Sequence, residues 1–308
     1  MAGNERPVAV VTGGAGFIGS HLAELLKDRY RVVVVDDLSA GSAENVADGI
    51  RLIRMDIRDA LLMRIFARIR PRLVYHLAAQ CDVGRSQAEP GLDADVNIRG
   101  TLNVLAACRA GGAGKLIFAS TAAVYGDPGA GAADEEAPVR PVSCYGLSKW
   151  TAEAYIRLIA ERGGPAFTIC RFANVYGPRQ KPHGEGGVVA QFLRRIAAGL
   201  PLRIFGDGEQ TRDFIYVRDA ARALADAADA ADGETLNISS GQSVTVNALA
   251  DALSGILGFS PARIYEPGRA GDIRSSCLDN RKACRLLGWK PCYTFERGLA
   301  ETFASLGA

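Results

Sequence analysis

The chain has 308 residues, of which 48% are hydrophobic and 23% are charged, and its formal net charge is +2. This length can bury a large core and suits one large domain with a smaller one beside it. The near-neutral charge argues against nucleic acid as the main partner, because such binding usually needs a basic face.

Cysteine and histidine usage argues against disulfide frameworks and metal sites. The seven Cys are an odd number and no two form a C-x-x-C pair, so we expect neither a disulfide framework nor a zinc site. His21, His76 and His183 lie far apart in the sequence, which disfavours a His-based metal site. Neither a signal peptide nor a membrane-spanning run is evident, so we expect a cytoplasmic protein with free thiols and no membrane partner.

Strand and helix patterns alternate through the first half of the chain. The predicted strands are Val8–Val11, Val32–Val35, Leu73–His76, Leu116–Ala119 and Phe167–Arg171, and helical spacing covers Phe17–Leu26, Gly100–Arg109 and Tyr145–Glu161. Four consecutive Val at 32–35 are typical of a strand that is buried on both faces. The alternation predicts an α/β fold with a doubly wound parallel sheet and helices on both of its faces.

The pattern changes after residue 173. Residues 177–187 are rich in Gly, Pro and charge, which indicates a loop. Helices are predicted at 190–198 and 245–257, the second beginning near Thr245 or Asn247. We expect a smaller α/β domain formed by about 174–213 and 239–308, and a larger domain formed by 1–173 and about 214–238.

Glycines separate the first predicted strand from the first predicted helix. Gly14, Gly16 and Gly19 satisfy G-x-G-x-x-G, and Gly13, Gly16 and Gly19 satisfy the wider G-x-x-G-x-x-G spacing. Glycines let the backbone turn tightly and approach a pyrophosphate, which then lies at the positive end of the helix. Such glycines often only form turns, but the strand before, the helix after and an acid further on favour a dinucleotide site.

That acid is Asp36, at the end of the four-Val strand. A carboxylate there can accept both hydroxyls of the adenosine ribose and would repel a 2′-phosphate. Asp37 adds to the repulsion, so NAD is favoured over NADP. The alternative is that Asp36 only caps a turn. Asp56 and Ile57 follow another short strand, where they could meet the adenine or simply end the strand.

Tyr145 and Lys149 form Y-x-x-x-K, whose two ends share one face of a helix. The ammonium favours the phenolate and lowers the pKa of Tyr145 toward working pH. Such a Tyr can take a proton from an alcohol while a hydride leaves the same carbon. Thr121 follows a predicted strand on the ligand side of the sheet, and could hydrogen-bond the reacting oxygen. The alternatives are a solvated helix face, and a turn cap for Thr121 or its neighbour Ser120.

An ordered set of motifs runs through nearly the whole chain. The motifs are TGGAGFIGSHL at 12–22, DDLS at 36–39, HLAAQ at 76–80, NIRGTLNVL at 97–105, STAAVYGD at 120–127, YGLSK at 145–149, RFANVYGPRQ at 171–180 and FGDGEQTRDFIYVRD at 205–219. This set resembles the extended short-chain dehydrogenase/reductase family, and within it the UDP-glucose 4-epimerases most of all. The resemblance implies a Rossmann domain that holds NAD and a C-terminal domain that holds a nucleotide sugar.

The resemblance also implies roles for individual residues. Tyr145 would be the base, Lys149 would bind the nicotinamide ribose and Thr121 would relay the proton. The implied cofactor contacts are Gly13, Gly16, Phe17, Ile18, Gly19, Asp36, Asp37, Asp56, Ile57, Leu77, Ala78, Ala79, Tyr145 and Lys149. The implied substrate contacts are Thr121, Tyr145, Val189 and Ser276, with Asn174 at the pyrophosphate, Arg212 at a phosphate, and Arg269 and Asp272 around the uridine. No metal site is implied.

The activity that the resemblance implies is that of a UDP-hexose 4-epimerase. Related dehydratases typically carry an Asp-Glu pair, and UDP-glucuronate decarboxylases a Glu, where this chain has Ala122 and Ala123. Elimination is therefore disfavoured, because no acid is placed to deprotonate carbon 5. UDP-glucuronate 4-epimerases commonly have Thr at the position of Asn174, which makes a uronate substrate less favoured. Another sugar-nucleotide oxidoreductase and a non-catalytic NAD-binding protein stay open, although the second would be expected to lose Tyr145 or Lys149.

Two further expectations come from the resemblance. The chain would form a homodimer, in which the helices at 100–109 and from 145 onward pair with their copies. Ser276, shortly after the R-x-G-D motif at 269–272, would face the carbon-2 substituent of the sugar. Ser276 and its neighbours Ser275 and Cys277 are small, so we expect room for an N-acetyl group unless another side chain narrows the pocket.

Overall fold

A seven-stranded sheet is the centre of the computed structural model, which describes residues 6–129, 131–181, 187–268 and 273–306. The strand order is β10-β6-β5-β4-β1-β2-β3. The strands are β1 Val8–Thr12, β2 Arg31–Asp36, β3 Arg51–Arg54, β4 Leu73–His76, β5 Lys115–Thr121, β6 Ala166–Phe172 and β10 Glu234–Ile238. Every neighbouring pair is parallel, which confirms the predicted doubly wound sheet.

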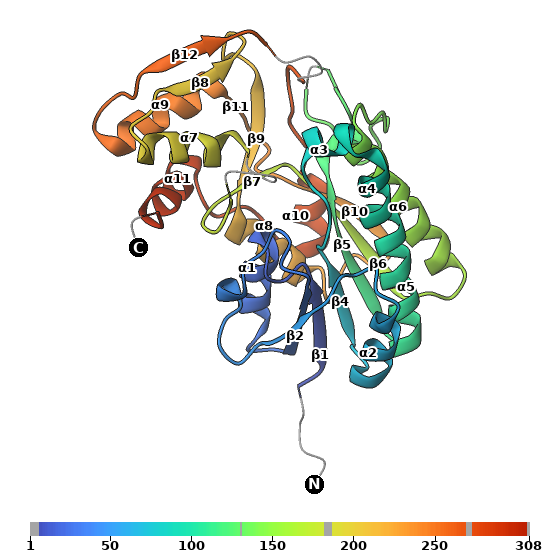
Figure 1. Cartoon of the computed structure of the whole chain (residues 1–308). Coiled ribbons are helices and arrows are strands. Elements are labelled where there is room, and N and C mark those ends of the chain that lie inside the picture. The colour runs from blue at the N-terminus through green and yellow to red at the C-terminus, as the bar shows by residue number, and fades with distance from the viewer. Residues whose placement is uncertain (1–5, 130, 182–186, 269–272, 307–308) are drawn as a thin grey trace.

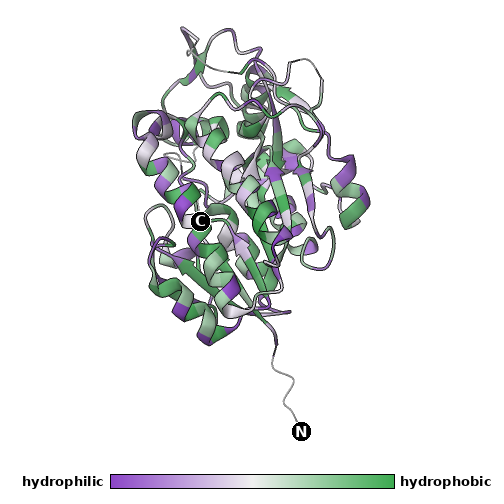
Figure 2. Ribbon diagram, turned by 90° about the vertical axis from the view of Figure 1, so that its right-hand side faces the viewer, coloured by the Kyte–Doolittle hydropathy of each residue, from purple (hydrophilic) through white to green (hydrophobic). Residues whose placement is uncertain are grey.

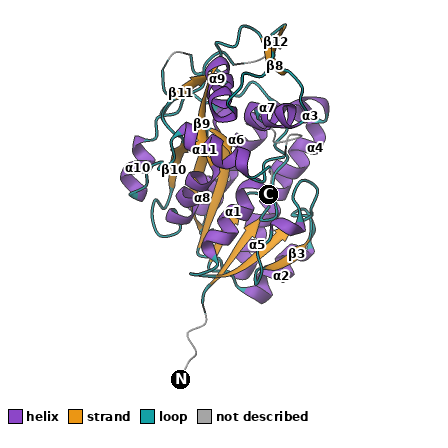
Figure 3. Ribbon diagram, turned by 90° about the vertical axis from the view of Figure 1, so that its left-hand side faces the viewer, coloured by secondary structure: helices purple, strands orange, loops and turns teal. Residues whose placement is uncertain are grey.

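Helices cover both faces of this sheet, as Figures 1 and 3 show. One face carries α2 Leu61–Ile69, α5 Gly100–Gly111 and α6 Cys144–Glu161, and the other carries α1 Phe17–Leu26, α8 Val217–Asp226 and α10 Arg281–Leu287. Because side chains alternate along a strand, Val33 and Val35 pack into the first layer while Val32 and Val34 pack into the second. Figure 2 shows apolar and polar stretches alternating along the covering helices, as amphipathic helices require.

A π-helical turn lies between β4 and α6 in the first helical layer. The short helices α3 Val83–Ala88 and α4 Pro90–Ala94 lead into this turn, Asp95–Arg99, which continues as α5. The turn carries Asn97, which is buried. Its Oδ1 accepts from the Gln80 amide at 2.9 Å and its Nδ2 donates to Ser148 Oγ at 3.0 Å. The turn therefore fastens the loop after β4 to α6.

A smaller part of the molecule lies beyond the carboxyl ends of the strands, at the top of Figures 1 and 3. It contains a three-stranded sheet, β11-β9-β7, and a two-stranded sheet, β12-β8. Its elements are β7 Asn174–Tyr176, α7 Val188–Ala197, β8 Leu202–Phe205, β9 Thr211–Tyr216, β11 Ser243–Thr245, α9 Val246–Leu257, β12 Arg263–Glu266 and α11 Phe295–Ala304. Thr245 caps α9 by accepting from the Ala248 amide at 2.9 Å, as its place in the sequence predicts.

The chain passes several times between the two parts. β9 pairs with β7 and β11 along residues 211–216, so the predicted boundary near 214 falls inside this strand. Near the end of the chain, α10 returns to pack against the large sheet beside α8. The division into a cofactor domain and a substrate domain stays a prediction.

Candidate active site

The ends of neighbouring strands place the predicted cofactor residues at one edge of the large sheet. β1, β2, β4 and β5 end at Thr12, Asp36, His76 and Thr121. The strand order runs in opposite directions from β1, toward β2 and β3 on one side and toward β4 and β5 on the other. Ligands of such sheets bind at the carboxyl ends of the strands where the order reverses.

The glycine turn after β1 packs tightly against its surroundings. Gly13 has φ +71°, and a Cβ placed on it would lie 2.6 Å from the Ala78 amide nitrogen. A Cβ on Gly19 would lie 2.1 Å from the Gly13 carbonyl oxygen, whereas one on Gly16 would approach nothing closer than that oxygen at 3.2 Å. The residue before α1 is Gly16, which has no side chain to cap the helix, so the first amides of α1 can face an anion. This cradle fits a pyrophosphate.

Asp36 is held at the edge of this turn by the backbone. Its Oδ2 accepts from the Ala15 amide at 3.0 Å and its Oδ1 from the Leu38 amide at 2.8 Å. Burial raises the pKa of Asp36, and the same two amides oppose the rise. Asp37 is exposed instead, and its Oδ1 accepts from the amide and hydroxyl of Ser39. The fixed carboxylate next to the glycines is therefore that of Asp36.

Asp56 and Ile57 follow β3, but the Asp56 carboxylate is engaged by an arginine. Arg58 Nε lies 3.0 Å from both carboxylate oxygens of Asp56, and Arg58 Nη1 lies 2.6 Å from Asp95 Oδ2. The hydrogen bond to Arg58 lowers the pKa of Asp56. Ile57 is buried against Gly100 of α5. A role for these two residues at the adenine stays a prediction.

Leu77, Ala78 and Ala79 follow β4 and are half-buried beside the glycine turn. Their position depends on His76, which is buried and bonds Thr12 Oγ1 through Nδ1 at 2.8 Å and Thr101 Oγ1 through Nε2 at 2.9 Å. The Thr101 hydroxyl donates to the Asn97 carbonyl, so it accepts from His76, which therefore carries its proton on Nε2. Burial, and after it the charge of Lys149, lower the pKa of His76 to about 3.

Tyr145 and Lys149 lie in the first two turns of α6. Ser143 caps the helix by accepting from the Gly146 amide at 3.1 Å, and the Tyr145 amide donates to Ser86 Oγ at 3.1 Å. Tyr145 is half-buried and Lys149 is buried. Lys149 Nζ donates to the Ala119 carbonyl at 2.6 Å. Its cation is thus fixed beside the end of β5.

A close approach of α6 to the end of β5 brings Tyr145 and Thr121 to the same edge. A Cβ on Gly146 would lie 2.5 Å from the Ala123 carbonyl oxygen, so glycine is needed for the helix to come this close. Thr121 Oγ1 accepts from the Ala123 amide at 3.1 Å, which leaves its hydroxyl hydrogen for another acceptor.

The predicted substrate residues lie mainly on the smaller part. Asn174 begins β7, and Arg212 on β9 donates from Nη1 to the carbonyls of Thr211 and Ile273, both at 2.8 Å. Ser276 is half-buried, a few residues after Ile273. Val189 packs with its side chain in the core of the smaller part. The predicted uridine residues Arg269 and Asp272 lie outside the described residues.

Comparison with known proteins decides the family. The sequence profile described as "NAD dependent epimerase/dehydratase family" matches residues 9–239. The chain belongs to this family. Its match includes the glycine turn, Asp36, Thr121, Tyr145 and Lys149, and ends just after β10.

Known epimerases match nearly the whole length of this chain. A UDP-glucose 4-epimerase from Mycolicibacterium smegmatis is 40% identical over 301 residues, which cover 95% of this chain and 96% of the relative. The crystal structure of UDP-glucose 4-epimerase with UDP-glucose from Thermotoga maritima is 42% identical, with a TM-score of 0.95 over 97% of this chain and 98% of that one. UDP-glucose 4-epimerase from Thermus thermophilus, solved as a complex with NAD, is 40% identical, with a TM-score of 0.93 over 98% and 99%.

Several buried polar residues around this epimerase-family site were not predicted from the sequence. Asp213 is fully buried and accepts from the Ser240 amide at 2.8 Å, the Ser240 hydroxyl at 2.7 Å and the Leu278 amide at 3.3 Å. It therefore ties β9 to the segment that carries Ser276. Glu153 is also fully buried. Its spacing of four residues after Lys149 places it on the same helix face, a signal that was present in the sequence.

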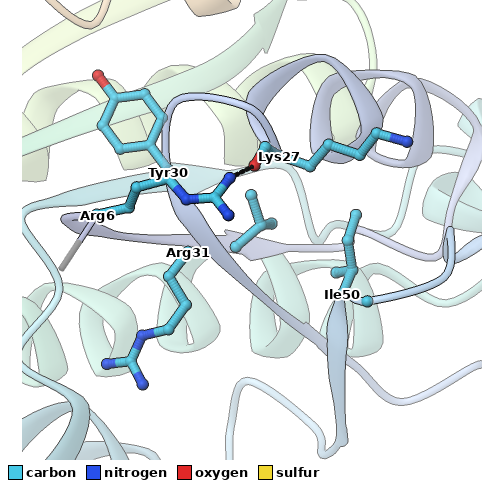
Figure 4. Close-up of a pocket in the computed structure, with 7 residues that line it drawn as sticks. Arg6, Lys27, Tyr30, Arg31 and Ile50 are labelled. Atoms are coloured by element: carbon cyan, nitrogen blue, oxygen red, sulfur yellow. Dashed lines mark hydrogen bonds between the residues drawn. The ribbon is translucent and has the colours of Figure 1, made fainter.

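A second candidate for an anion site lies on another surface of the described chain. A basic depression at the amino end of the sheet contains Arg6, Lys27 and Arg31, but Figure 4 shows the ends of the Lys27 and Arg31 side chains pointing apart. Arg6 donates to the Lys27 carbonyl at 2.6 Å, so the three cations do not converge on one anion. Within the described ranges, no cluster of His, Cys, Asp and Glu is suited to a metal ion, and no helix is long and apolar enough to span a bilayer.

Proposed function

We propose that this chain is a UDP-hexose 4-epimerase that inverts carbon 4 of the sugar by transient oxidation with bound NAD. The observation that carries this proposal is that Tyr145, Lys149 and Thr121 meet where α6 contacts the end of β5, at the same edge of the sheet as the glycine turn after β1. UDP-glucose 4-epimerases that match over the full chain support the choice of substrate class.

The residues around the glycine turn fit NAD. The uncapped start of α1 and the open side of Gly16 suit the pyrophosphate, and the fixed carboxylate of Asp36 suits the adenosine ribose. When bound, NAD would supply an acceptor and donor of hydride at carbon 4. Lys149 would bind the nicotinamide ribose.

Proton transfer falls to residues on α6 and β5. Tyr145 would take the proton of the carbon-4 hydroxyl and return it to the same oxygen after the sugar has turned over. The buried ammonium of Lys149 follows Tyr145 by four residues on the same helix face. The Thr121 hydroxyl would hold or relay the proton at this oxygen. Asn174 and Arg212 would hold the diphosphate while the sugar turns, since a guanidinium suits phosphate oxygens.

The turn after Thr121 favours epimerisation over elimination. Ala122 and Ala123 form it with Val124, and neither carries an acid that could remove the proton on carbon 5. The sugar would therefore leave with all of its oxygens, inverted at carbon 4.

The test is incubation of the purified protein with UDP-glucose, UDP-galactose, UDP-N-acetylglucosamine and UDP-glucuronate, with resolved products and NADH followed by absorbance. We expect 4-epimers with no net change in NADH. Tyr145→Phe should lower kcat by roughly 100-fold or more, because the proton-transfer group is lost. Tyr155→Phe is the matched control, because Tyr155 lies on the exposed side of the same helix, and it should be fully active. Net consumption of NADH, or full activity of Tyr145→Phe, would refute the proposal.

We also propose a homodimer that forms through α6. Leu147, Trp150, Tyr155 and Leu158 are 50%, 41%, 38% and 43% exposed. Their spacing places them on one face of the helix, opposite the buried Lys149. An exposed apolar stripe of this kind suits pairing with a second copy. Light scattering at micromolar concentration should give the dimer mass, and Trp150→Glu should give a monomer; a monomeric unaltered protein would contradict this.

We further place the protein in the cytoplasm. All seven cysteines are free thiols, which suits a reducing compartment. Cell fractionation would test the location, and recovery in an exported fraction would contradict it.

A further inference from the structure

A buried ion pair joins α6, the helix that carries Tyr145, to β6 of the large sheet. Glu153 on α6 is 0% exposed and Arg171 on β6 is 3% exposed. Arg171 Nε donates to Glu153 Oε1 at 3.0 Å and Arg171 Nη2 donates to Glu153 Oε2 at 2.7 Å. Two parallel bonds fix the relative orientation of both side chains, so α6 is locked to the sheet one turn beyond Lys149.

The pair also binds the two ends of the turn that carries Thr121. Ser120, the partner of Arg171 across β5 and β6, donates from Oγ to Glu153 Oε1 at 2.5 Å. After the turn, the Tyr125 hydroxyl accepts from Arg171 Nη1 at 3.0 Å and donates to Asn237 Oδ1 on β10 at 2.7 Å. Glu153 thus holds the entry to the turn, and Arg171 holds its exit.

The same turn contacts α6 directly. The Ala119 carbonyl accepts from Lys149 Nζ, and the Ala123 carbonyl lies against Gly146. Residues 119, 120, 123 and 125 are therefore each fixed, either to α6 or to the ion pair that anchors it. Thr121 lies between these points, and Tyr145 precedes Gly146 by one residue. The ion pair consequently sets the position of Thr121 relative to Tyr145.

Stability alone does not account for such a pair. Removing two charges from water is costly, and apolar side chains of similar volume often give an equally stable fold. We infer that Glu153 and Arg171 are positioning residues for the carbon-4 reaction: they hold the Thr121 turn in register with Tyr145 and Lys149. This inference rests on the proposed epimerase function for its kinetic readout.

The test compares three variants with a control. Glu153→Gln removes the negative charge of the pair and leaves the positive charge of Arg171, Ser120→Ala removes one bond to the pair, and the double variant E153M/R171L replaces the pair by apolar side chains. The control is Lys115→Met, at the other end of β5. Lys115 is 5% exposed and its Nζ donates to the Ala230 carbonyl at 2.6 Å, so the variant also removes a buried cation from this strand.

The test requires kcat, KM, thermal stability and bound NAD to be measured for each protein. Glu153→Gln should lower kcat by roughly 10- to 100-fold, because small misplacements of reacting groups are costly, with KM changed by less than about threefold. Ser120→Ala should lower kcat by less and keep full stability. The double variant should recover stability but not kcat. Lys115→Met should lose stability and keep kcat. A double variant, or a Ser120→Ala variant, with the kcat of the unaltered protein would overturn the inference.

A second readout does not depend on turnover. The amides of Ala123, Tyr125 and Gly126 are bonded within the turn, so their hydrogen exchange reports whether the turn is held. Exchange should be faster in Glu153→Gln and Ser120→Ala and unchanged in Lys115→Met. If the unaltered protein epimerises no UDP-sugar, the proposed function fails. Hydrogen exchange still tests whether the ion pair holds the turn that carries Thr121. Unchanged exchange in all of the variants would overturn the inference that Glu153 and Arg171 hold this turn.

Discussion

Lowering the pH from 7 to 5 should destabilise the folded chain through His76. The imidazole is buried between Thr12 and Thr101, and its pKa is lowered to about 3 by burial and by Lys149. In the unfolded chain the pKa of a histidine is about 6.5. Below that pH the unfolded chain binds a proton that the folded chain does not, so stability is complete above about pH 6.5 and falls as the pH drops toward 3.

The magnitude follows from these two values. At pH 5 the unfolded imidazole is almost fully charged while the folded one stays neutral, which gives about 2 kcal/mol less stability than at pH 7, at 1.36 kcal/mol per unit. Urea unfolding of the unaltered protein and of His76→Gln, each at both pH values, isolates this effect because every other titrating group is shared. Glutamine can bond both threonines and does not titrate.

The expected result is a double difference of about 2 kcal/mol, with the unaltered protein the more acid-sensitive. Equal pH dependence of the two proteins would show that His76 is charged in the folded chain or accessible to water. Either result would refute the neutral Nε2–H imidazole bonded to Thr12 on β1 and Thr101 on α5.

Four substitutions test other parts of the site. Asp36→Arg should reduce the preference for NAD over NADP by roughly 10- to 100-fold in dissociation constants, since bonds to a charged group are lost; equal affinities in the unaltered protein would exclude the ribose role. Gly19→Ala should abolish NAD binding and lower the melting temperature, because its Cβ would strike the Gly13 carbonyl at 2.1 Å; wild-type binding would contradict this. Asp213→Asn should raise KM for the UDP-sugar at unchanged NAD affinity, because the segment carrying Ser276 loses its anchor; an unchanged KM would count against that anchoring role. Ser276→Tyr should suppress turnover of UDP-N-acetylglucosamine but not of UDP-glucose, and an unaltered enzyme that uses only UDP-glucose would refute the expected room for an N-acetyl group at Ser276.

Local pattern was enough to predict the elements that carry the cofactor site. The helix expected at 17–26 is α1, and the strand expected at 73–76 is β4, with the same bounds. Strands buried on both faces have continuous apolar runs. Glycines occur where the turn after β1 must pass close to Ala78. These signals lie within a few neighbouring residues, so one sequence is enough to read them.

The side-chain partners could not be predicted in the same way. The sequence gives no sign that the Asp56 carboxylate bonds Arg58, which also reaches Asp95. Arg171 and Glu153 meet from different elements, 18 residues apart. Such pairs depend on how helices pack across the sheet, and that packing leaves no periodic trace in the sequence. The family resemblance alone supplied the expected roles of Asn174 and Arg212 at the diphosphate, because no local pattern indicates them.

The order of strands has a consequence for synthesis of the chain. β6 is completed at residue 172, but its outer neighbour β10 begins only at residue 234. Until then a growing chain presents a bare parallel edge, rich in apolar residues, of the kind that recruits other strands. The segment made in that interval contains β7, α7, β8 and β9 of the smaller part, so the large sheet can be completed only after these elements have been synthesised. A ribosome that stalls within this interval would release a chain prone to aggregation.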